Sequence, residues 1–241
     1  MTSDPRVLWV TGAGSGMGRA SAVAAARGRR VVLSGRRVDA LQETARMVQA
    51  AGGEPLVVPM GVGEAETVLQ AADAITTEWG GVDDLMLSAG LNSPRRTWAD
   101  QTMDEVQTVV TTNLTATILT INSVLGSMRA RGGGQVVVVS SYSAWRFTPY
   151  AGVAYSASKT ALAAVCQTLN AQEAVHGIRA CHLCPGDVDS EFLHLRPEVP
   201  DAAARALMLR PEDIGRAVKF VLASPPHVRI DELVLTPISQ A

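Results

Sequence analysis

The 241-residue sequence has little of what marks the more specialised classes of protein. Aromatic residues make up only 4%, there are three cysteines, and the formal net charge is −2. A charge this close to zero gives no electrostatic reason to bind a nucleic acid or an anionic membrane. The sequence also lacks an unbroken apolar run of about 18 residues, the length that a membrane-spanning helix needs. We therefore expect neither nucleic acid nor membrane as a partner.

The cysteines predict a reduced protein without a metal site. Cys166, Cys181 and Cys184 cannot all pair with one another. Cys181 and Cys184 would point apart in a strand, because alternate side chains face opposite sides, and no second pair of ligands accompanies them. Residues 1–6 show no basic region followed by a long apolar segment, as a secretory signal would. We expect a cytoplasmic protein.

The composition that remains is that of an ordinary globular domain. Apolar residues make up 47% and charged residues 18%, and 241 residues suit one large α/β domain. No shift in composition, repeat or low-complexity segment marks a boundary. We predict a single domain over residues 1–241.

Short β-branched runs alternate with longer helical segments along the whole chain. The runs predict strands at 7–10, 31–33, 56–58, 84–87, 136–139, 178–183 and 233–235. The segments between them predict helices at 16–27, 39–51, 64–79, 103–131, 152–175 and 211–222. Continuous apolar strands suit a parallel sheet buried on both faces. The pattern predicts a single-domain Rossmann fold, a doubly wound parallel sheet of about seven strands with helices on both faces.

A glycine-rich turn follows the first predicted strand and opens a helix. Gly12, Gly16 and Gly18 provide the spacing Gly-x-x-x-Gly-x-Gly. Free N–H groups and the dipole at a helix N-terminus favour a phosphate, so the turn predicts a site for a dinucleotide pyrophosphate. A tight turn without a ligand is the alternative. The candidate contacts are Gly12, Gly14, Ser15, Gly16, Met17 and Gly18.

The segment after the second strand bears on the choice of cofactor. NAD enzymes carry an acidic residue there for the ribose hydroxyls, whereas this sequence has Gly35 followed by Arg36 and Arg37. Arginine pairs with a 2′-phosphate through charge-assisted hydrogen bonds. The segment favours NADP over NAD, and a solvated arginine pair is the alternative.

Tyr155 and Lys159 are four residues apart and therefore lie on the same face of a helix. A lysine ammonium beside a phenol favours the phenolate, so we expect the pKa of Tyr155 to be lowered toward neutral pH. Together with the glycine-rich turn, this pair predicts hydride chemistry at a carbonyl or an alcohol.

The full ordered set of motifs resembles the short-chain dehydrogenase/reductase family. The set comprises Thr11 to Gly18, Ser88-Ala89-Gly90, Asn113, Ser140-Ser141, Tyr155-x-x-x-Lys159 and Pro185-Gly186. It covers essentially the whole chain. The C-terminal part, residues 211–237, looks like the branch that includes bacterial 3-hydroxy acid dehydrogenases and small-carbonyl reductases.

The resemblance implies a role for each matching residue. Tyr155 would be the acid in reduction and the base in oxidation, and Lys159 would lower its pKa and hold the nicotinamide ribose. Ser141 would bind the substrate oxygen, and Asn113 would keep a water chain between the lysine and solvent. The remaining cofactor contacts would be Val62, Ala89, Gly90, Pro185, Gly186, Val188 and Ser190.

The sequence departs from the family pattern at three points. Leu87-Ser88 stands where two asparagines usually brace the sheet, and Met60-Gly61-Val62 replaces the usual carboxylate near the adenine. Ser141 lies 14 residues before Tyr155, one more than the commonest spacing. This leaves open which of Ser140, Ser141 and Ser143 meets the substrate. Our choice is Ser141, with Ser140 structural.

The substrate pocket is predicted from loops at the carboxyl ends of the strands. These include an irregular segment at about 187–208, with a short helix at 202–208. The candidate pocket residues are Asn92, Ser143, Trp145, Phe147 and Phe192, with Tyr150 and Leu193 nearby. They predict an apolar or aromatic substrate, and packing of loops or subunits is the alternative. Arg95, Arg96 and Arg146 are candidates to bind a substrate carboxylate or to be simply solvated.

These observations predict an NADP-dependent oxidoreductase that acts on a small-molecule substrate and interconverts an alcohol with a ketone or aldehyde. An NAD-preferring alcohol dehydrogenase is one alternative, and a cofactor-sensing protein without turnover is another. The resemblance further implies a homotetramer, or a homodimer, that packs through the helices at 103–131 and 152–175.

Overall fold

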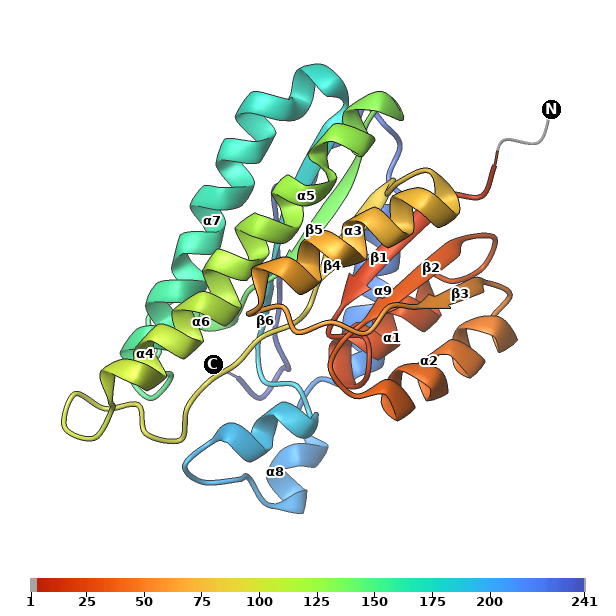
Figure 1. Cartoon of the computed structure of the whole chain (residues 1–241). Coiled ribbons are helices and arrows are strands. Elements are labelled where there is room, and N and C mark those ends of the chain that lie inside the picture. Colours follow the sequence, from red (N-terminus) through yellow and green to blue (C-terminus); the bar gives the residue numbers. More distant parts are fainter. Residues whose placement is uncertain (1–3, 241) are drawn as a thin grey trace.

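The computed structural model describes residues 4–240, and within them seven strands form one parallel sheet in the order β3-β2-β1-β4-β5-β6-β7 (Figure 1). The strands are β1 Val7–Thr11, β2 Arg30–Ser34, β3 Glu54–Val57, β4 Asp84–Leu87, β5 Gly134–Val139, β6 Ile178–Pro185 and β7 Glu232–Leu235. This confirms the predicted fold class. Each predicted strand is present, with ends that differ by at most two residues.

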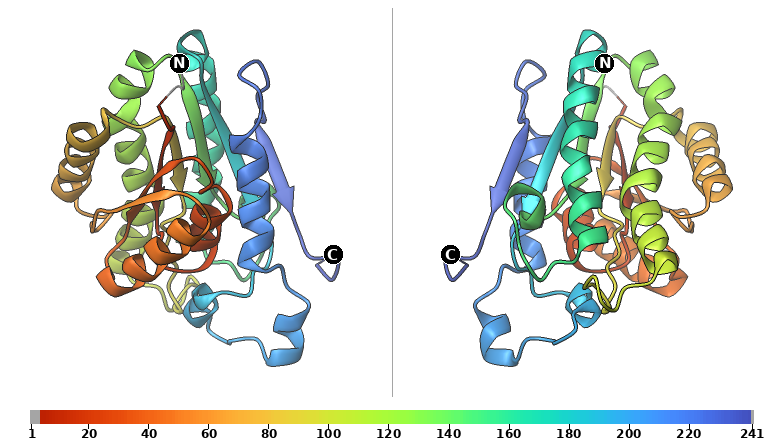
Figure 2. Two further views of the ribbon diagram at one scale, coloured as in Figure 1. Left: turned by 90° about the vertical axis from the view of Figure 1, so that its right-hand side faces the viewer. Right: turned by 90° about the vertical axis from the view of Figure 1, so that its left-hand side faces the viewer.

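Two layers of helices cover the sheet, as Figures 1 and 2 show. One layer comprises α1 Gly16–Ala24, α2 Val38–Ala50 and α9 Pro211–Leu222, and the other comprises α3 Ala65–Trp79, α5 Ala116–Ala130 and α7 Val153–Glu173. Strand side chains alternate between the layers. Leu8 and Val10 of β1 therefore pack in the core beneath the first layer of helices, while Val7 and Trp9 pack in the core beneath the second layer.

The helix α4 (Met103–Val110) runs through a π-helical turn, Thr111–Thr115, into α5. By length and composition alone, Met103–Ala130 would suffice to cross a membrane. In the structure Ile121, Val124 and Met128 of this helix pack into the core. Part of its apolar composition is therefore explained by packing. The π-turn contains Asn113, and such turns inside α-helices frequently occur at functional sites.

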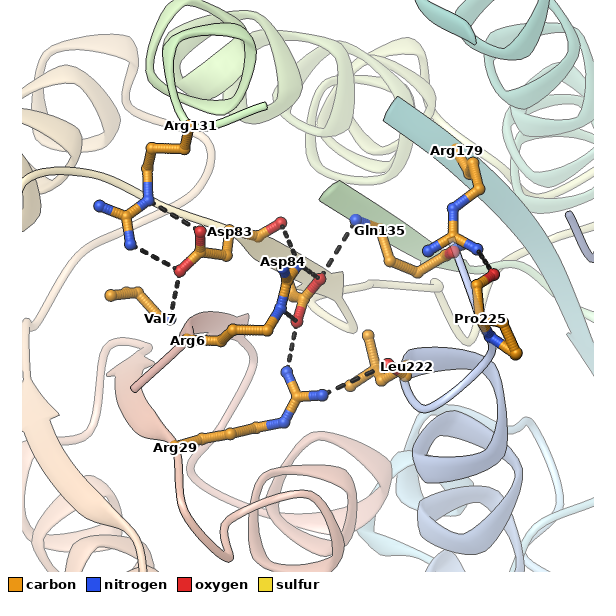
Figure 3. Close-up of polar contacts among 10 residues, drawn as sticks. All are labelled: Arg6, Val7, Arg29, Asp83, Asp84, Arg131, Gln135, Arg179, Leu222 and Pro225. Atoms are coloured by element: carbon orange, nitrogen blue, oxygen red, sulfur yellow. Dashed lines mark hydrogen bonds and ion pairs between the residues drawn. The ribbon is translucent and has the colours of Figure 1, made fainter. Parts of the chain in front are cut away.

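A buried ion network joins the amino ends of the central strands (Figure 3). Asp83 and Asp84 lie at its centre. Donors to the two carboxylates are the side chains of Arg6, Arg29 and Arg131 and the backbone N–H groups of Val7 and Gln135. Burial alone would raise the pKa of Asp83, but the hydrogen bonds from Arg131 and Val7 outweigh it and lower the pKa. The network ties β1, β4 and β5 together at the end of the sheet that carries no predicted site residue.

The predicted site residues all follow the opposite, carboxyl ends of the strands. The glycine-rich turn follows β1, residues 88–96 follow β4, residues 140–152 follow β5, and residues 186–208 follow β6. The last of these segments contains the 3-10 helix Glu191–Leu195 and α8 (Ala202–Ala206), and it projects beyond the sheet in Figures 1 and 2. Parallel strands thereby deliver these four separate stretches of chain to one place, the usual position of a ligand site in this architecture.

Candidate functional site

A cavity of about 710 Å³ opens at the carboxyl ends of the strands, and Ser141, Tyr155 and Lys159 all line it. Its volume suits a small organic molecule. The other predicted residues on its walls are Met17, Gly90, Asn92, Ser143, Pro185, Gly186, Val188, Ser190 and Phe192. The structure therefore brings candidate acid/base groups, cofactor contacts and pocket residues to one site.

Lys159 is held by the sheet itself. Its Nζ donates to the carbonyl of Val139, at the end of β5, over 2.8 Å, and it lies 5.9 Å from the centroid of the Tyr155 ring. Burial lowers the pKa of Lys159 to about 8. An ammonium has three donors, so this contact leaves two for other partners on the cavity side. A Cβ on Gly90 would lie 3.5 Å from Nζ, so the backbone of the β4 loop passes close to the amine.

The pKa of Tyr155 moves in the direction opposite to the prediction. Burial raises it, and this effect outweighs the lowering by the hydrogen bond from Ser141 and by the charges of Arg96 and Arg196. The expectation failed because it counted the charge of the lysine and neglected the loss of water around the phenol, which favours the neutral form. In the protein as described, Tyr155 is a protonated phenol at neutral pH.

The three candidate serines have different surroundings. Ser141 lines the cavity beside Tyr155 and lowers the pKa of that phenol. Ser140 also touches the cavity, but its side chain is buried and its Oγ donates to the carbonyl of Lys159 over 3.0 Å. Ser143 Oγ donates to Ser141 Oγ over 3.0 Å. The geometry places Ser141 next to the phenol, Ser140 as a brace of α7, and Ser143 behind Ser141.

Asn113 connects the loop after β4 to α7. Its Oδ1 accepts from the N–H of Leu91 at 2.7 Å, and its Nδ2 donates to the carbonyl of Leu91 and to Ser158 Oγ. A Cβ on Gly90 would lie 3.5 Å from Asn113 Oδ1 as well as from Lys159 Nζ. The asparagine therefore lies close to the lysine while fixing the segment that separates them.

The glycine-rich turn has the geometry of a backbone cradle. Gly12 and Gly16 have φ of 66° and 52°, in the left-handed region that favours glycine. A Cβ on Gly12 would lie 2.8 Å from the N of Ala89, and one on Gly18 would collide with the carbonyl of Gly12. Ser15 precedes α1 without a capping side-chain hydrogen bond, so the first N–H groups of the helix point out free. These groups fit a pyrophosphate.

The structure separates the two arginines after β2. Arg37 forms an ion pair of 2.8 Å with Glu191 of the substrate segment, whereas Arg36 is exposed and forms no hydrogen bond within residues 4–240. Ser15 also lowers the pKa of Glu191, so this carboxylate lies beside the glycine-rich turn. Arg36 is thus the freer of the two for a 2′-phosphate.

Ala89 and Val62 are two further predicted cofactor contacts that lie off the walls of the cavity. The N–H of Ala89 donates to Thr11 Oγ1 over 3.3 Å, and so does that of Ser88 over 3.2 Å. The Thr11 hydroxyl therefore braces the central strands at the place where the family usually has asparagines. Val62 packs against the core on the α3 side, and the neighbouring Met60 N–H donates to the carbonyl of Gly35 over 3.0 Å. The β3 end therefore lies beside the end of β2, on the side of the site that carries Arg36.

Two of the aromatic residues predicted for the pocket lie off the cavity wall. Trp145 is not on the cavity wall, because the short helix α6 (Tyr142–Trp145) turns its ring between Tyr142 and Arg146. Phe147, with 85% of its surface exposed, projects into solvent. Phe192 does line the cavity, with its ring centroid 6.1 Å from that of Tyr155, and Tyr150 and Leu193 line it too.

The three candidate arginines also differ. Arg95 forms an ion pair with Glu105, and Arg146 lies over the ring of Trp145, so neither faces the cavity. Arg96 lines it. Sequence spacing could not separate adjacent residues such as Arg95 and Arg96, because the loop after β4 has no regular period.

Sequence reasoning missed several residues of the site. Arg196 and Asp187 line the cavity as an ion pair, and Gln240, from the C-terminal tail, accepts from the N–H of Asp187 over 2.8 Å. The only signal for Gln240 was its position just after the last strand.

A cluster of three possible metal ligands lies where β6 pairs with β7. His182 Nδ1 lies 3.0 Å from Glu232 Oε1 and 3.3 Å from Cys184 Sγ. The prediction considered Cys181 with Cys184 and missed the carboxylate that β7 places opposite His182. Burial raises the pKa of the Cys184 thiol to about 12, so this group is a neutral member of a hydrogen-bonded cluster.

Comparisons with known proteins match the arrangement. Residues 6–199 fit the family model of the short chain dehydrogenases. A glycine betaine reductase of Emericella nidulans is 33% identical over 238 residues, which are 96% of this chain and 19% of that protein. The chain therefore spans less than a fifth of the fungal reductase. An uncharacterized oxidoreductase of Staphylococcus aureus is 31% identical over 235 residues, with 97% of each chain covered.

A solved structure extends the likeness to the whole fold. The alcohol dehydrogenase from the archaeon Thermococcus sibiricus, complexed with 5-hydroxy-NADP, has a TM-score of 0.87 and 30% identity. The match covers 98% of this chain and 98% of that one.

Proposed function

This chain belongs to the short-chain dehydrogenase family and is an NAD(P)-dependent oxidoreductase, and from that premise we propose that it interconverts an alcohol with a ketone or aldehyde, preferring NADP. The observation that supports the proposal most directly is the position of Tyr155. Its phenol has Ser141 and Lys159 beside it and faces a cavity next to the glycine-rich turn.

The residues present fit a nicotinamide dinucleotide. The pyrophosphate would be held by the free N–H groups at the start of α1, the nicotinamide ribose by the remaining donors of Lys159, and a 2′-phosphate by Arg36. Bound there, the cofactor supplies or accepts the hydride. Ser190 lies beside Gly16 and also lines the cavity, so it spans the two parts of the site.

In the direction of reduction, Tyr155 donates a proton. The raised pKa means that the phenol carries its proton at neutral pH, as a proton donor must. Ser141 donates a hydrogen bond to the substrate oxygen and so holds it against the phenol. The aromatic wall at Phe192 excludes water from the reacting oxygen.

In the direction of oxidation, Tyr155 must first release its proton. The positive charges of Arg96 and Arg196 and the nearby ammonium of Lys159 stabilise the phenolate that results. Burial opposes this step, so oxidation is favoured by alkaline conditions. Asn113 keeps the segment beside Lys159 in place, on the path by which the proton would reach solvent.

The first test is initial rates with NADPH and with NADH on a panel of ketones, oxo acids and aldehydes, measured in both directions. Turnover would support the proposal. Tight cofactor binding without turnover on any member of a broad panel would contradict it in favour of a sensing protein.

Arg36 carries the preference for NADP. We expect Arg36→Gln to lower kcat/KM for NADPH by about 10- to 100-fold, the usual weight of a charge-assisted hydrogen bond, with little change for NADH. Arg46→Gln, on the exposed face of α2 beside Glu43, is the matched control for net charge. An unchanged ratio of NADPH to NADH in Arg36→Gln would assign this side chain to solvent and favour the NAD alternative.

Lys159 should make cofactor binding depend on pH. In the protein without cofactor, the Lys159 side chain has a pKa of about 8, so it is charged below that pH and neutral above it. A ribose that accepts from the ammonium favours the charged form, so affinity falls as the pH rises through about 8, by at most about tenfold per unit. Fluorescence titration with NADPH between about pH 6 and about pH 10 measures this.

The matched control for this pH dependence is the one other lysine in the sequence, Lys219, which is exposed on α9. Lys219→Met should keep the wild-type profile, whereas Lys159→Met should bind weakly and without inflection near pH 8. A profile in Lys159→Met that still bends there would assign the titration to another group.

We extend the proposal to assembly and compartment. Two or four copies would associate through the outer faces of the α4–α5 helix and α7, where Met103 and Ile118 are exposed apolar residues. The three cysteines are free and buried, in keeping with a reducing cytoplasm.

A further inference from the structure

We propose that Arg96 binds a carboxylate of the substrate, so that the protein acts on a small hydroxy acid and its oxo acid. This inference rests on the proposed function and names the chemical class of its substrate. It assigns Arg96 as a specificity-determining residue, because the guanidinium would select the substrate by charge and take no part in proton transfer.

Three carbonyl groups hold the guanidinium of Arg96 at the cavity wall. Nε donates to Ser93 over 2.8 Å, Nη1 to Tyr150 over 3.4 Å, and Nη2 to Leu195. These carbonyls come from the segments after β4, β5 and β6, so the side chain lies where the three loops meet. An arginine fixed in this way loses little entropy on binding, which favours recognition of a ligand.

The fixing contacts leave both the charge and some of the donors unused. A guanidinium has five N–H donors, and the three carbonyls take one each. Within residues 4–240, no carboxylate lies within ion-pair distance of Arg96, although Glu198 also lines the cavity. Arg196, on the same wall, already forms an ion pair with Asp187. Arg96 is therefore a partly buried cation of the cavity with no charged partner of its own.

Burial makes this unpaired charge costly. Loss of water and the nearby charge of Arg196 both lower the pKa of Arg96, which shows that the positive charge is disfavoured where it lies. A carboxylate that enters the cavity removes that cost and accepts the two free N–H donors in the fork geometry that suits it. An anion is therefore the ligand that this part of the cavity favours.

The charges on the cavity wall favour an anion with a single negative charge. Three cations, Arg96, Lys159 and Arg196, face two carboxylates, Asp187 and Glu198, which leaves one net positive charge. A carboxylate neutralises this charge, whereas a phosphate would leave an excess of negative charge. Arg96 also acts electrostatically on Tyr155, so a carboxylate bound there lies near the group that protonates the carbonyl. Both ends of an oxo acid therefore have a partner in one cavity.

The test compares acids with their neutral esters. The probes are 2-, 3- and 4-oxopentanoate, their methyl esters, and a neutral 3-oxoacyl thioester, each reduced with NADPH by the wild type and by Arg96→Gln, Arg96→Lys and Arg95→Gln. We expect the wild type to prefer one of the acids to its ester, and Arg96→Gln to lose about 10- to 100-fold in kcat/KM for that acid alone. Arg96→Lys should keep part of the preference. Arg95→Gln, a neighbouring arginine paired with Glu105 away from the cavity, should keep all of it.

Other results would overturn the assignment. Equal rates on acid and ester in the wild type, or a preference for the thioester, would exclude a carboxylate site. An equal loss on acid and ester in Arg96→Gln would show that the side chain only holds the loops together. Calorimetric titration with the corresponding hydroxy acid provides a readout without turnover. Acid binding that depends on Arg96 in a protein that reduces nothing would keep the carboxylate site and reject the proposed function, and absence of any acid binding would reject the site.

Discussion

Replacing Tyr155 with phenylalanine should lower kcat for carbonyl reduction by about 10²- to 10⁴-fold, the range for loss of a general acid. The substitution removes the hydroxyl beside Ser141 and leaves the ring in place against Phe192. The substitution leaves the glycine-rich turn and the Lys159 side chain unchanged. The affinity for the cofactor should therefore remain within a few-fold of that of the wild type. Stopped-flow reduction and NADPH titration measure the two quantities on one preparation.

Tyr150→Phe is the matched control, because it makes the same change on a cavity-lining tyrosine that is 87% exposed. We expect it to keep activity within about threefold of the wild type, as for a hydroxyl without a role in the transition state. Activity in Tyr155→Phe close to that of the control would show that another group moves the proton. A parallel loss of activity and cofactor binding would assign Tyr155 to the structure of the site.

Replacing Asp84 with alanine should lower the free energy of unfolding by about 3–5 kcal/mol, the cost of breaking a buried ion network from one side. The Asp84 side chain is only 1% exposed, and it accepts from Arg6, Arg29 and the N–H of Gln135 (Figure 3). Removing it leaves two arginines and a buried backbone donor without their acceptor. Urea unfolding followed by circular dichroism measures the loss.

Glu43→Ala is the control for this experiment, since it removes a carboxylate from an exposed pair with Arg46. Exposed pairs contribute little, so the unfolding midpoint should not change. Because the Asp84 network is at the end of the sheet away from the cavity, the Asp84→Ala protein that remains folded should keep its kcat. A loss of stability no larger than that of the control would show that the arginines find other partners.

The sequence predicted the fold because its signals were local and repeated. An apolar run such as Val136–Val139, or a glycine-rich turn such as Gly12 to Gly18, indicates local structure through residues that are close in sequence. The parallel topology then follows from the alternation of strands and helices. The grouping of Ser141, Tyr155 and Lys159 at one cavity was equally predictable. Two of them share a helix face, and the third follows the strand beside it.

What could not be predicted depends on contacts between distant residues or on burial. The ion pair of Arg37 with Glu191 joins residues 154 apart, and Gln240 reaches the site from the far end of the chain. The rotation of the short helix α6 sends Trp145 away from the cavity. The direction of the Tyr155 pKa depends on how completely the walls exclude water, and no pattern of residue types records that.

Lys159 and Arg96 mark two parts of the cavity that are held in place by different kinds of structure. Lys159 is fixed by the end of a central strand, and Asn113 fixes the adjoining backbone, so the proton-handling half inherits the rigidity of the sheet. Among residues 4–240, the partners that fix Arg96 are carbonyls of three surface loops. Loops tolerate substitution, insertion and deletion far better than buried strands. An engineer could therefore rebuild the loops to accept a neutral or a cationic substrate and leave the chemistry of the other half as it stands.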